Sequence, residues 1–164
     1  MIWIPKSIQS KSMYDLIMLA YTDHLTGVGN RNLLEELRSD FENDDYFFVT
    51  MVDVDNLKTR NDKYGHGAGD ELLKHIALDL QKAAAWVFRL GGDEFLLIDN
   101  YDPTLVLSSI PNISYGVVRK GQFEDLSNAM HSADKKMYEM KIQHRKERQY
   151  DNRVKDAETR KSTE

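Results

Sequence analysis

The sequence contains no cysteine, and it lacks any long apolar run. The first absence excludes a disulfide framework, a thiol nucleophile and a cysteine-based zinc site, and it suits a cytoplasmic protein. The longest apolar candidate, residues 16–21, is far shorter than the roughly 20 residues that a membrane-spanning helix requires. The short apolar run in residues 1–5 is also a poor signal peptide. We therefore expect a cytoplasmic chain with no membrane segment.

An excess of positive charge is missing as well. The formal net charge is −5, so bulk electrostatics do not favour a nucleic-acid partner. If such a protein handles a polyanion, it needs metal ions or a few well-placed cations. The length of 164 residues, 41 % of them hydrophobic, suits one soluble domain that buries a core without disulfides.

Apolar spacing predicts a mixed α/β (α+β) fold with helices packed on a sheet. The predicted helices cover residues 12–21, a second segment around 33–37, 70–85 and 126–141. The predicted strands cover residues 46–54, 86–90, 95–98 and 113–118, and the first is apolar on both faces, as a central strand is. Asp70 stands where a helix N-cap is expected. From Arg145 onward the chain is dense in charge, which predicts a frayed helix or disorder.

Two acidic residues, Asp53 and Asp55, end the first predicted strand on one face. Taken alone, such a pair is more often a solvated strand end than a metal site. Gly91 and Gly92 predict a tight hairpin of type I′, and Asp93 follows it directly. If the hairpin lies beside the first strand, Asp53 and Asp93 converge, and two close carboxylates favour a cation between them. Oxygen ligands of this kind suit Mg²⁺.

A glycine-rich segment, residues 61–70, joins these two features. Its Asn61 and Asp70 supply an amide and a carboxylate, which could match the N1–H and 2-amino edge of guanine. The simpler alternative is that Asn61 is a turn residue and Asp70 only a helix cap, and spacing alone favours that alternative.

Five motifs in order resemble the GGDEF family of diguanylate cyclases over about residues 20–146. They are Asp23-His24-Leu25-Thr26, then Asp53-Val54-Asp55 with Lys58, Asn61 and Asp70, then Arg89-Leu90-Gly91-Gly92-Asp93-Glu94-Phe95, then Ser114-Tyr115-Gly116, and finally Ala133-Asp134 through Lys141. The resemblance implies a palm-like nucleotide-cyclase fold with a mostly antiparallel sheet flanked by helices. It also implies the condensation of two GTP molecules into cyclic di-GMP and pyrophosphate across a homodimer.

The resemblance also implies roles for individual residues. Two Mg²⁺ ions per active site, or Mn²⁺ as a substitute, would be held by the side chains of Asp53 and Asp93 and the carbonyl of Val54. Catalysis would rest on Asp93, Lys58 and Glu94, with Asp93 as base or orienting group. The substrate-binding residues would be Asn61, His66, Asp70, Gly91, Gly92, Lys141 and Arg145.

The sequence departs from the family pattern in three places. Lys82-Ala83-Ala84-Ala85 replaces the Arg-x-x-Asp product site of many relatives, which predicts no product inhibition there. The stretch 95–114 is short and allows about two helical turns between residues 102 and 109. His144 stands where a glycine is common, which makes the placing of Arg145 less secure than that of Lys141.

These observations divide the chain into a lead-in helix (1–20), a GGDEF domain (21–146) and a charged C-terminal tail (147–164). Residues 1–12 are expected to be loosely held. Besides an active cyclase, two alternatives stay open: a catalytically silent module that binds GTP or a regulatory protein partner, and a cyclase that makes another cyclic dinucleotide.

Overall fold

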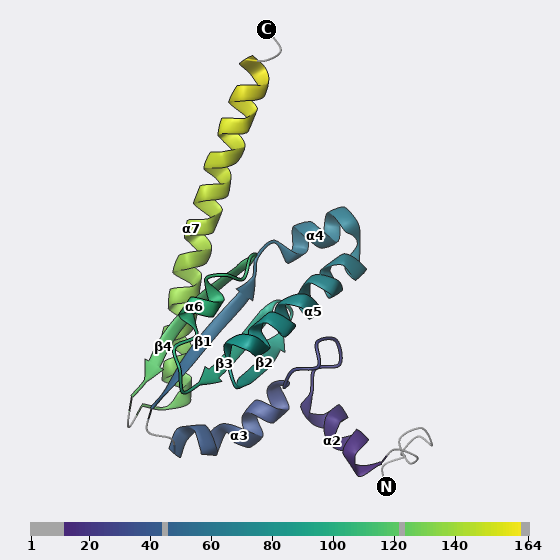
Figure 1. Cartoon of the computed structure of the whole chain (residues 1–164), viewed down its shortest axis with the longest axis vertical. Helices are drawn as coiled ribbons and strands as arrows, with labels where there is room; N and C mark the ends of the chain where they lie inside the picture. Colours follow the sequence, from purple (N-terminus) through teal and green to yellow (C-terminus); the bar gives the residue numbers. More distant parts are fainter. Residues whose placement is uncertain (1–11, 44–45, 122–123, 162–164) are drawn as a thin grey trace.

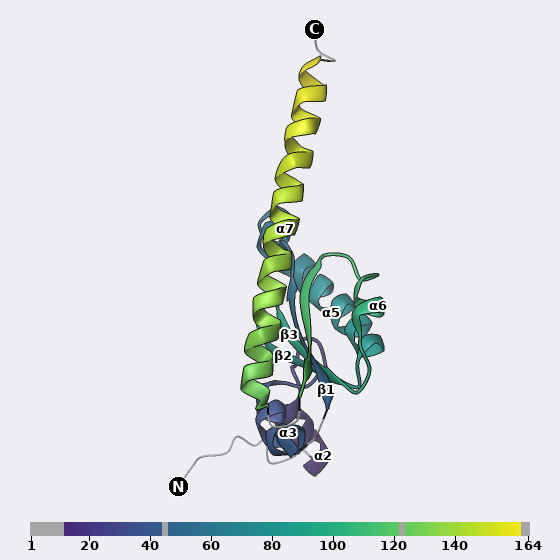
Figure 2. The ribbon, with the colours of Figure 1, turned by 90° about the vertical axis from the view of Figure 1, so that its left-hand side faces the viewer.

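A four-stranded sheet lies at the centre of the molecule, with helices on both of its faces (Figures 1 and 2). The structure is a computed structural model and describes residues 12–43, 46–121 and 124–161. The strand order is β2-β3-β1-β4, and each neighbouring pair is antiparallel. The strands are β1 (Phe47–Val54), β2 (Trp86–Gly91), β3 (Glu94–Asp99) and β4 (Ile113–Lys120). The predicted α+β class is confirmed.

Strand β1 is buried on both faces, as its unbroken apolar run predicts. Its alternating side chains separate into two hydrophobic clusters. Phe47, Val49 and Met51 belong to one cluster, whereas Val52 and Val54 belong to the other. Since alternation continues past the apolar run, Asp53 and Asp55 extend the row of Phe47, Val49 and Met51.

The two clusters place the helices on opposite faces of the sheet. Helices α5 (His66–Ala83) and α6 (Thr104–Leu107) pack on the side of Val52 and Val54. Helices α3 (Arg31–Asn43) and α7 (Leu126–Lys161) pack on the other side. The edge-on view in Figure 2 shows α7 and α5 separated by the sheet. The two acidic residues therefore lie on the face that α7 covers.

Gly116 in β4 explains how closely α7 approaches this face. A Cβ at Gly116 would lie 2.1 Å from the carbonyl oxygen of Ala133 and 2.4 Å from the backbone nitrogen of Met137. Only glycine fits against helix backbone at that distance. The close approach brings the side chains of α7 within reach of the end of β1.

The glycine-rich segment forms more helix than its sequence predicts. Residues Leu57–Tyr64 form α4, a helix that the sequence did not predict, and Gly65 ends it with φ +85°. Helix α5 begins at His66, four residues before the predicted start. Asp70 therefore lies inside the helix, and its predicted role as N-cap is wrong because Gly65 occupies that position.

Helix α7 is longer than predicted. Its 36 residues continue without a break to Lys161, and its C-terminal part extends well beyond the sheet (Figure 1). The prediction that the chain frays from Arg145 is therefore wrong for the described residues. The boundary proposed after residue 146 lies inside this helix. Charged residues with good helix propensity continue the helix once the domain has nucleated it.

The remaining elements are short. Helix α2 (Met13–Tyr21) confirms the predicted lead-in helix, and Ser12 and Asp15 form a capping box at its start. The expectation that residues 1–12 are loosely held falls, apart from Ser12, outside the described residues. Helix α6 spans only four residues, shorter than the two turns predicted.

Candidate functional site

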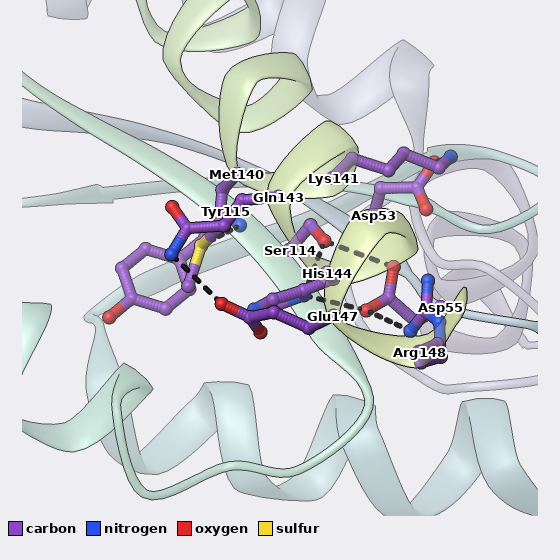
Figure 3. A network of polar contacts seen from close by, with 10 residues as sticks. All are labelled: Asp53, Asp55, Ser114, Tyr115, Met140, Lys141, Gln143, His144, Glu147 and Arg148. Atoms are coloured by element: carbon purple, nitrogen blue, oxygen red, sulfur yellow. Dashed lines mark hydrogen bonds and ion pairs between the residues drawn. The ribbon is translucent and has the colours of Figure 1, made fainter. Parts of the chain in front are cut away.

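The candidate site lies where β1 ends. Both acidic residues there are buried, Asp53 with 3 % and Asp55 with 4 % of its surface exposed. A buried carboxylate needs compensating partners. Figure 3 shows that α7 supplies them from one side, with Lys141 beside Asp53 and with His144 and Arg148 beside Asp55.

The two oxygens of Asp53 differ in their surroundings. Lys141 donates a hydrogen bond of 2.5 Å from Nζ to Oδ2 of Asp53. Oδ1 is buried and has no hydrogen-bond partner among the described residues. Burial raises the pKa of Asp53, the bond from Lys141 opposes that change, and the nearby charge of Asp93 adds to it, so that the pKa lies above its ordinary value. Asp53 is therefore a carboxylate that favours a further cation.

The predicted hairpin is confirmed beside β1, but its turn type is wrong. Asp53 pairs with Glu94 in the ladder, and the backbone N–H of Val54 donates to the carbonyl of Asp93 over 2.9 Å. The turn residues are Gly92 and Asp93, and of these only Gly92 has positive φ, at +51°. A type I′ turn requires positive φ at both positions. The hairpin brings Asp93 to the end of β1.

Arg89 holds this turn in place. Its guanidinium donates from Nη2 and Nε to the carbonyl of Gly92, over 2.7 and 3.1 Å, and from Nη1 to Asp23 over 3.0 Å. Asp23 also accepts bonds from the backbone and hydroxyl of Thr26. Burial raises the pKa of Asp23, but the bonds from Thr26 and Arg89 outweigh it and leave that pKa lowered. Asp23 and Arg89 both belong to motifs that resemble the family, but the sequence did not predict that they contact each other.

A pocket of about 220 Å³ opens beside these groups. Three predicted cations, Lys58, Lys141 and Arg145, line it together with Arg148. Asp93 and Val54 line it as well. Four basic side chains around one small pocket suit a phosphate-bearing ligand. The tertiary structure thus places the three basic residues that were predicted to bind phosphate around one pocket. It adds Arg148, which the sequence did not predict.

The predicted guanine-binding residues lie on α4 and α5. Asn61 packs against Gly69, where an added Cβ would lie 2.0 Å from its Oδ1. That oxygen is buried without a hydrogen-bond partner in the part of the chain that the structure describes. His66 and Asp70 are exposed. These residues, together with Glu94, Gly91 and Gly92, lie outside the set that lines the pocket.

Comparison with known protein families decides the identity of the fold. The model described as "Diguanylate cyclase, GGDEF domain" matches residues 20–105. This chain belongs to the GGDEF family. The residues that resemble the family signature, Arg89 to Phe95, form the hairpin of β2 and β3.

Curated relatives of this GGDEF chain carry different activities in their names. Diguanylate cyclase DgcP from Escherichia coli K12 is 31 % identical over 156 residues, covering 77 % of this chain and 46 % of DgcP. Cyclic di-GMP phosphodiesterase PdeR from the same organism is 38 % identical over 89 residues, covering 51 % of this chain and 14 % of PdeR. The chain thus spans less than half the length of either relative.

Solved structures of GGDEF domains share the fold. One, described as a microbial GGDEF domain in a novel interaction mode with cyclic di-GMP, superposes with a TM-score of 0.70 at 30 % identity and covers 79 % of this chain and 95 % of that one. Diguanylate cyclase SiaD, solved with its activator SiaC from Pseudomonas aeruginosa, gives a TM-score of 0.66 at 27 % identity and covers 84 % and 65 %.

The GGDEF site has the donor set that Mg²⁺ prefers. Within the described ranges, no group of three or more His, Cys, Asp and Glu side chains comes together as a metal site. Mg²⁺, however, typically uses one or two protein carboxylates and completes its shell with substrate phosphates and water. Asp53, with its unpartnered buried Oδ1, and Asp93 next to it fit that pattern.

Within the same ranges, no helix has the length and hydropathy to span a membrane.

Proposed function

We propose that this GGDEF domain condenses two GTP molecules into cyclic di-GMP and pyrophosphate, with Mg²⁺ held by Asp53, Asp93 and the carbonyl of Val54. One observation carries the proposal. The carboxylate of Asp53 is buried, has one oxygen without a partner among the described residues and lies within the electrostatic influence of Asp93, which lines a pocket together with four basic side chains. That combination matches a triphosphate bound with a divalent cation.

The residues of the chain divide the work by position. Lys58, Lys141 and Arg145 line the pocket and would bind the phosphates. Lys141 can reach both Asp53 and that pocket, so it can neutralise either the carboxylate or a phosphate. The bound Mg²⁺ would supply charge stabilisation to the transferred phosphoryl group. Asp93, in a turn that Arg89 holds, would orient the attacking 3′-hydroxyl or accept its proton.

Recognition of guanine would fall to Asn61 and Asp70. Asn61 lies against Gly69, the residue directly before Asp70, and we assign the guanine edge to this amide and the neighbouring carboxylate. His66 at the start of α5 would lie beside the nucleotide. Gly91 and Gly92 would let the hairpin backbone approach the phosphates, and Glu94, paired with Asp53 across the ladder, would support the metal-binding edge.

Each subunit would bind one GTP, so turnover needs two subunits face to face, and the rate should rise more steeply than linearly with protein concentration. A regulatory protein could set that arrangement, since the neighbour SiaD was solved with an activator. The alternative of a silent GTP-binding or partner-binding module is favoured by the relative PdeR, which is named as a phosphodiesterase.

The deciding experiment is incubation of the purified chain with Mg²⁺ and GTP, ATP or both, followed by identification of the products by mass. Cyclic di-GMP from GTP alone, lost in Asp93→Ala, is the expected result. GTP binding without product at high protein concentration would support the silent module. A product that contains adenine would support a cyclase of other specificity.

A further inference from the structure

The two buried carboxylates at the end of β1, Asp53 and Asp55, differ in the hydrogen bonds that their oxygens accept. Asp53 keeps Oδ1 without a partner among the described residues. Both oxygens of Asp55 are engaged. Ser114 donates from Oγ to Oδ1 over 3.0 Å, while Nδ1 of His144 lies 2.9 Å and Nη1 of Arg148 lies 3.3 Å from Oδ2 (Figure 3). Although Asp55 also lines the pocket, protein donors engage both of its oxygens, whereas they engage only one oxygen of Asp53.

The protons of this cluster have one consistent arrangement. A carboxylate only accepts hydrogen bonds, so the close approach of His144 to Asp55 assigns the ring proton to Nδ1. The single hydroxyl proton of Ser114 goes to the other oxygen of Asp55, and Ser114 Oγ can then accept from the same Nδ1 at 3.1 Å. Ser114 is fully buried and Asp55 nearly so, which makes these bonds costly to lose.

The donors on α7 fall on one stripe. Lys141, His144, Arg145 and Arg148 are spaced i, i+3, i+4 and i+7, which places them on one face of the helix. One turn of helix advances about 5.4 Å, and two residues of a strand advance about 6.6 Å. Lys141 on one turn of α7 therefore contacts Asp53. His144 and Arg148 on the following turns contact Asp55, which lies two residues further along the chain.

This match fixes where α7 lies along β1. A shift of the helix by one turn would separate Lys141 from Asp53 and would break at least one of the two contacts that His144 and Arg148 make with Asp55. The same helix carries Lys141 and Arg145, whose side chains line the pocket. The anchoring of α7 depends on the residue at position 144. A glycine there would contribute no side chain to the contact with Asp55 and would weaken the helix that carries Arg148.

We propose that Asp55 is a positioning residue and not a metal ligand: with Ser114, His144 and Arg148 it anchors α7 and so holds Lys141 and Arg145 at the phosphate pocket. The second half of this inference rests on the proposed function, whereas the anchoring of α7 does not. The two halves are therefore tested by separate measurements.

The anchor is tested first, without nucleotide, by hydrogen exchange of the backbone amides of residues 141–148. His144→Ala keeps a good helix former but removes the contact, so exchange there should rise about tenfold if the anchor protects this part of the helix. His144→Gln, which retains a donor, should restore part of the protection. His131→Ala is the matched control, because His131 is an exposed histidine on the same helix. Equal exchange in wild type and His144→Ala would overturn the anchor.

The role of Asp55 as a positioning residue is tested next by two binding measurements on the full chain. Mn²⁺ binding without nucleotide, followed by electron paramagnetic resonance, should be unchanged in Asp55→Asn and in His144→Ala but lost in Asp53→Asn. Binding of a fluorescent GTP analogue with Mg²⁺ should weaken about tenfold in His144→Ala. A structural defect alone would lower both affinities, and it would also show in the thermal melting of the variant.

Two further outcomes contradict the proposal. Loss of Mn²⁺ binding in a folded Asp55→Asn variant would make Asp55 a metal ligand. An unchanged affinity of His144→Ala for the GTP analogue would separate the anchor from the phosphate pocket. If Asp55→Asn does not fold, His144→Ala and His144→Gln still test the anchor and its effect on binding of the GTP analogue. Failure of the wild type to bind the analogue would instead contradict the proposed function, and the exchange experiment would still report on the anchor.

Discussion

Asp23 and Arg89 form a partly buried ion pair, 3.0 Å between Nη1 and Oδ1, that joins the first motif of the chain to the signature hairpin. The side chains are only 17 % and 12 % exposed. Because Arg89 also bonds the carbonyl of Gly92, the pair links the segment before α3 to the turn that presents Asp93. The stability of this turn therefore depends on a residue 66 positions earlier in the chain.

We expect Asp23→Asn to lower the free energy of unfolding by about 2 kcal/mol, the range for a hydrogen bond between charged groups. Chemical denaturation of the two proteins measures this difference. Asp79→Asn serves as the control, because the pair of Asp79 with Lys82 lies on the surface, and exposed pairs contribute less than about 1 kcal/mol. Equal losses in the two variants would contradict a special role for Asp23.

The same pair predicts a pH dependence. The pKa of Asp23 is lowered in the folded state from its ordinary value of 3.8, so the folded state binds this proton less readily than the unfolded state does. Its contribution to stability is full above pH 3.8 and falls as the pH drops through the folded-state pKa. The difference in unfolding free energy between wild type and Asp23→Asn should therefore shrink as the pH falls below 3.8. A difference that stays constant over that range would show that ionisation of Asp23 contributes nothing.

Mg²⁺ should stabilise the folded chain through Asp53. The pKa of Asp53 lies above its ordinary value, so the folded state loses stability as the pH rises through that pKa and the carboxylate ionises. A bound cation reverses this loss at neutral pH. With Mg²⁺ at 100 times its dissociation constant, the unfolding free energy should rise by about 2.7 kcal/mol. Thermal melting with and without Mg²⁺ measures the effect, which should be absent in Asp53→Asn.

Guanine recognition should be sensitive to Gly69 and not to Gly67. An alanine Cβ at Gly69 would lie 2.0 Å from Oδ1 of Asn61 and would displace this amide. At Gly67 an added Cβ has no described heavy atom within 4 Å. Gly69→Ala should therefore weaken GTP binding at least tenfold, a change of about 1.4 kcal/mol, while Gly67→Ala leaves it unchanged. Calorimetric titration with GTP and with ATP checks both expectations.

We expect no inhibition of the proposed cyclase activity by cyclic di-GMP through residues 82–85. The four side chains there are Lys82, Ala83, Ala84 and Ala85, without the arginine and aspartate of the Arg-x-x-Asp site. Initial rates should be the same with and without added cyclic di-GMP. The double variant Lys82→Arg, Ala85→Asp should gain sensitivity, since a guanidinium and a carboxylate restore the missing charges. Strong inhibition of the wild type would place a product site elsewhere.

Much of the site could be predicted from the sequence because its chemistry is local. The apolar run of β1 with Asp53 and Asp55 at its end predicted a central strand with both acids on one face, and the structure confirms both points. The Gly91-Gly92 pair predicted a tight turn beside that strand. Alternation and turn chemistry depend on near neighbours in the chain, so they can be read without coordinates.

Apart from the type I′ turn, which the φ of Asp93 contradicts, the predictions that failed concern where helices begin and end. Asp70 was predicted as a cap, but Gly65 has that role, because a residue with φ +85° both ends α4 and starts α5. The charged residues after Arg145 were predicted to fray, yet α7 continues through them. Local propensity sets such boundaries only weakly, and packing of the domain against the helix overrides it.

The sequence by itself determined the family, the central strand and the identity of the acidic and basic residues, since each depends on a short pattern of neighbouring letters. Only the tertiary structure decided how those residues are paired. Asp53 is paired with Lys141, Asp55 with His144 and Arg148, and Asp23 with Arg89. These partners lie 66 to 93 positions apart along the chain. The pairs that involve α7 depend on how closely this helix approaches the sheet at Gly116, which is a property of packing and not of any local pattern.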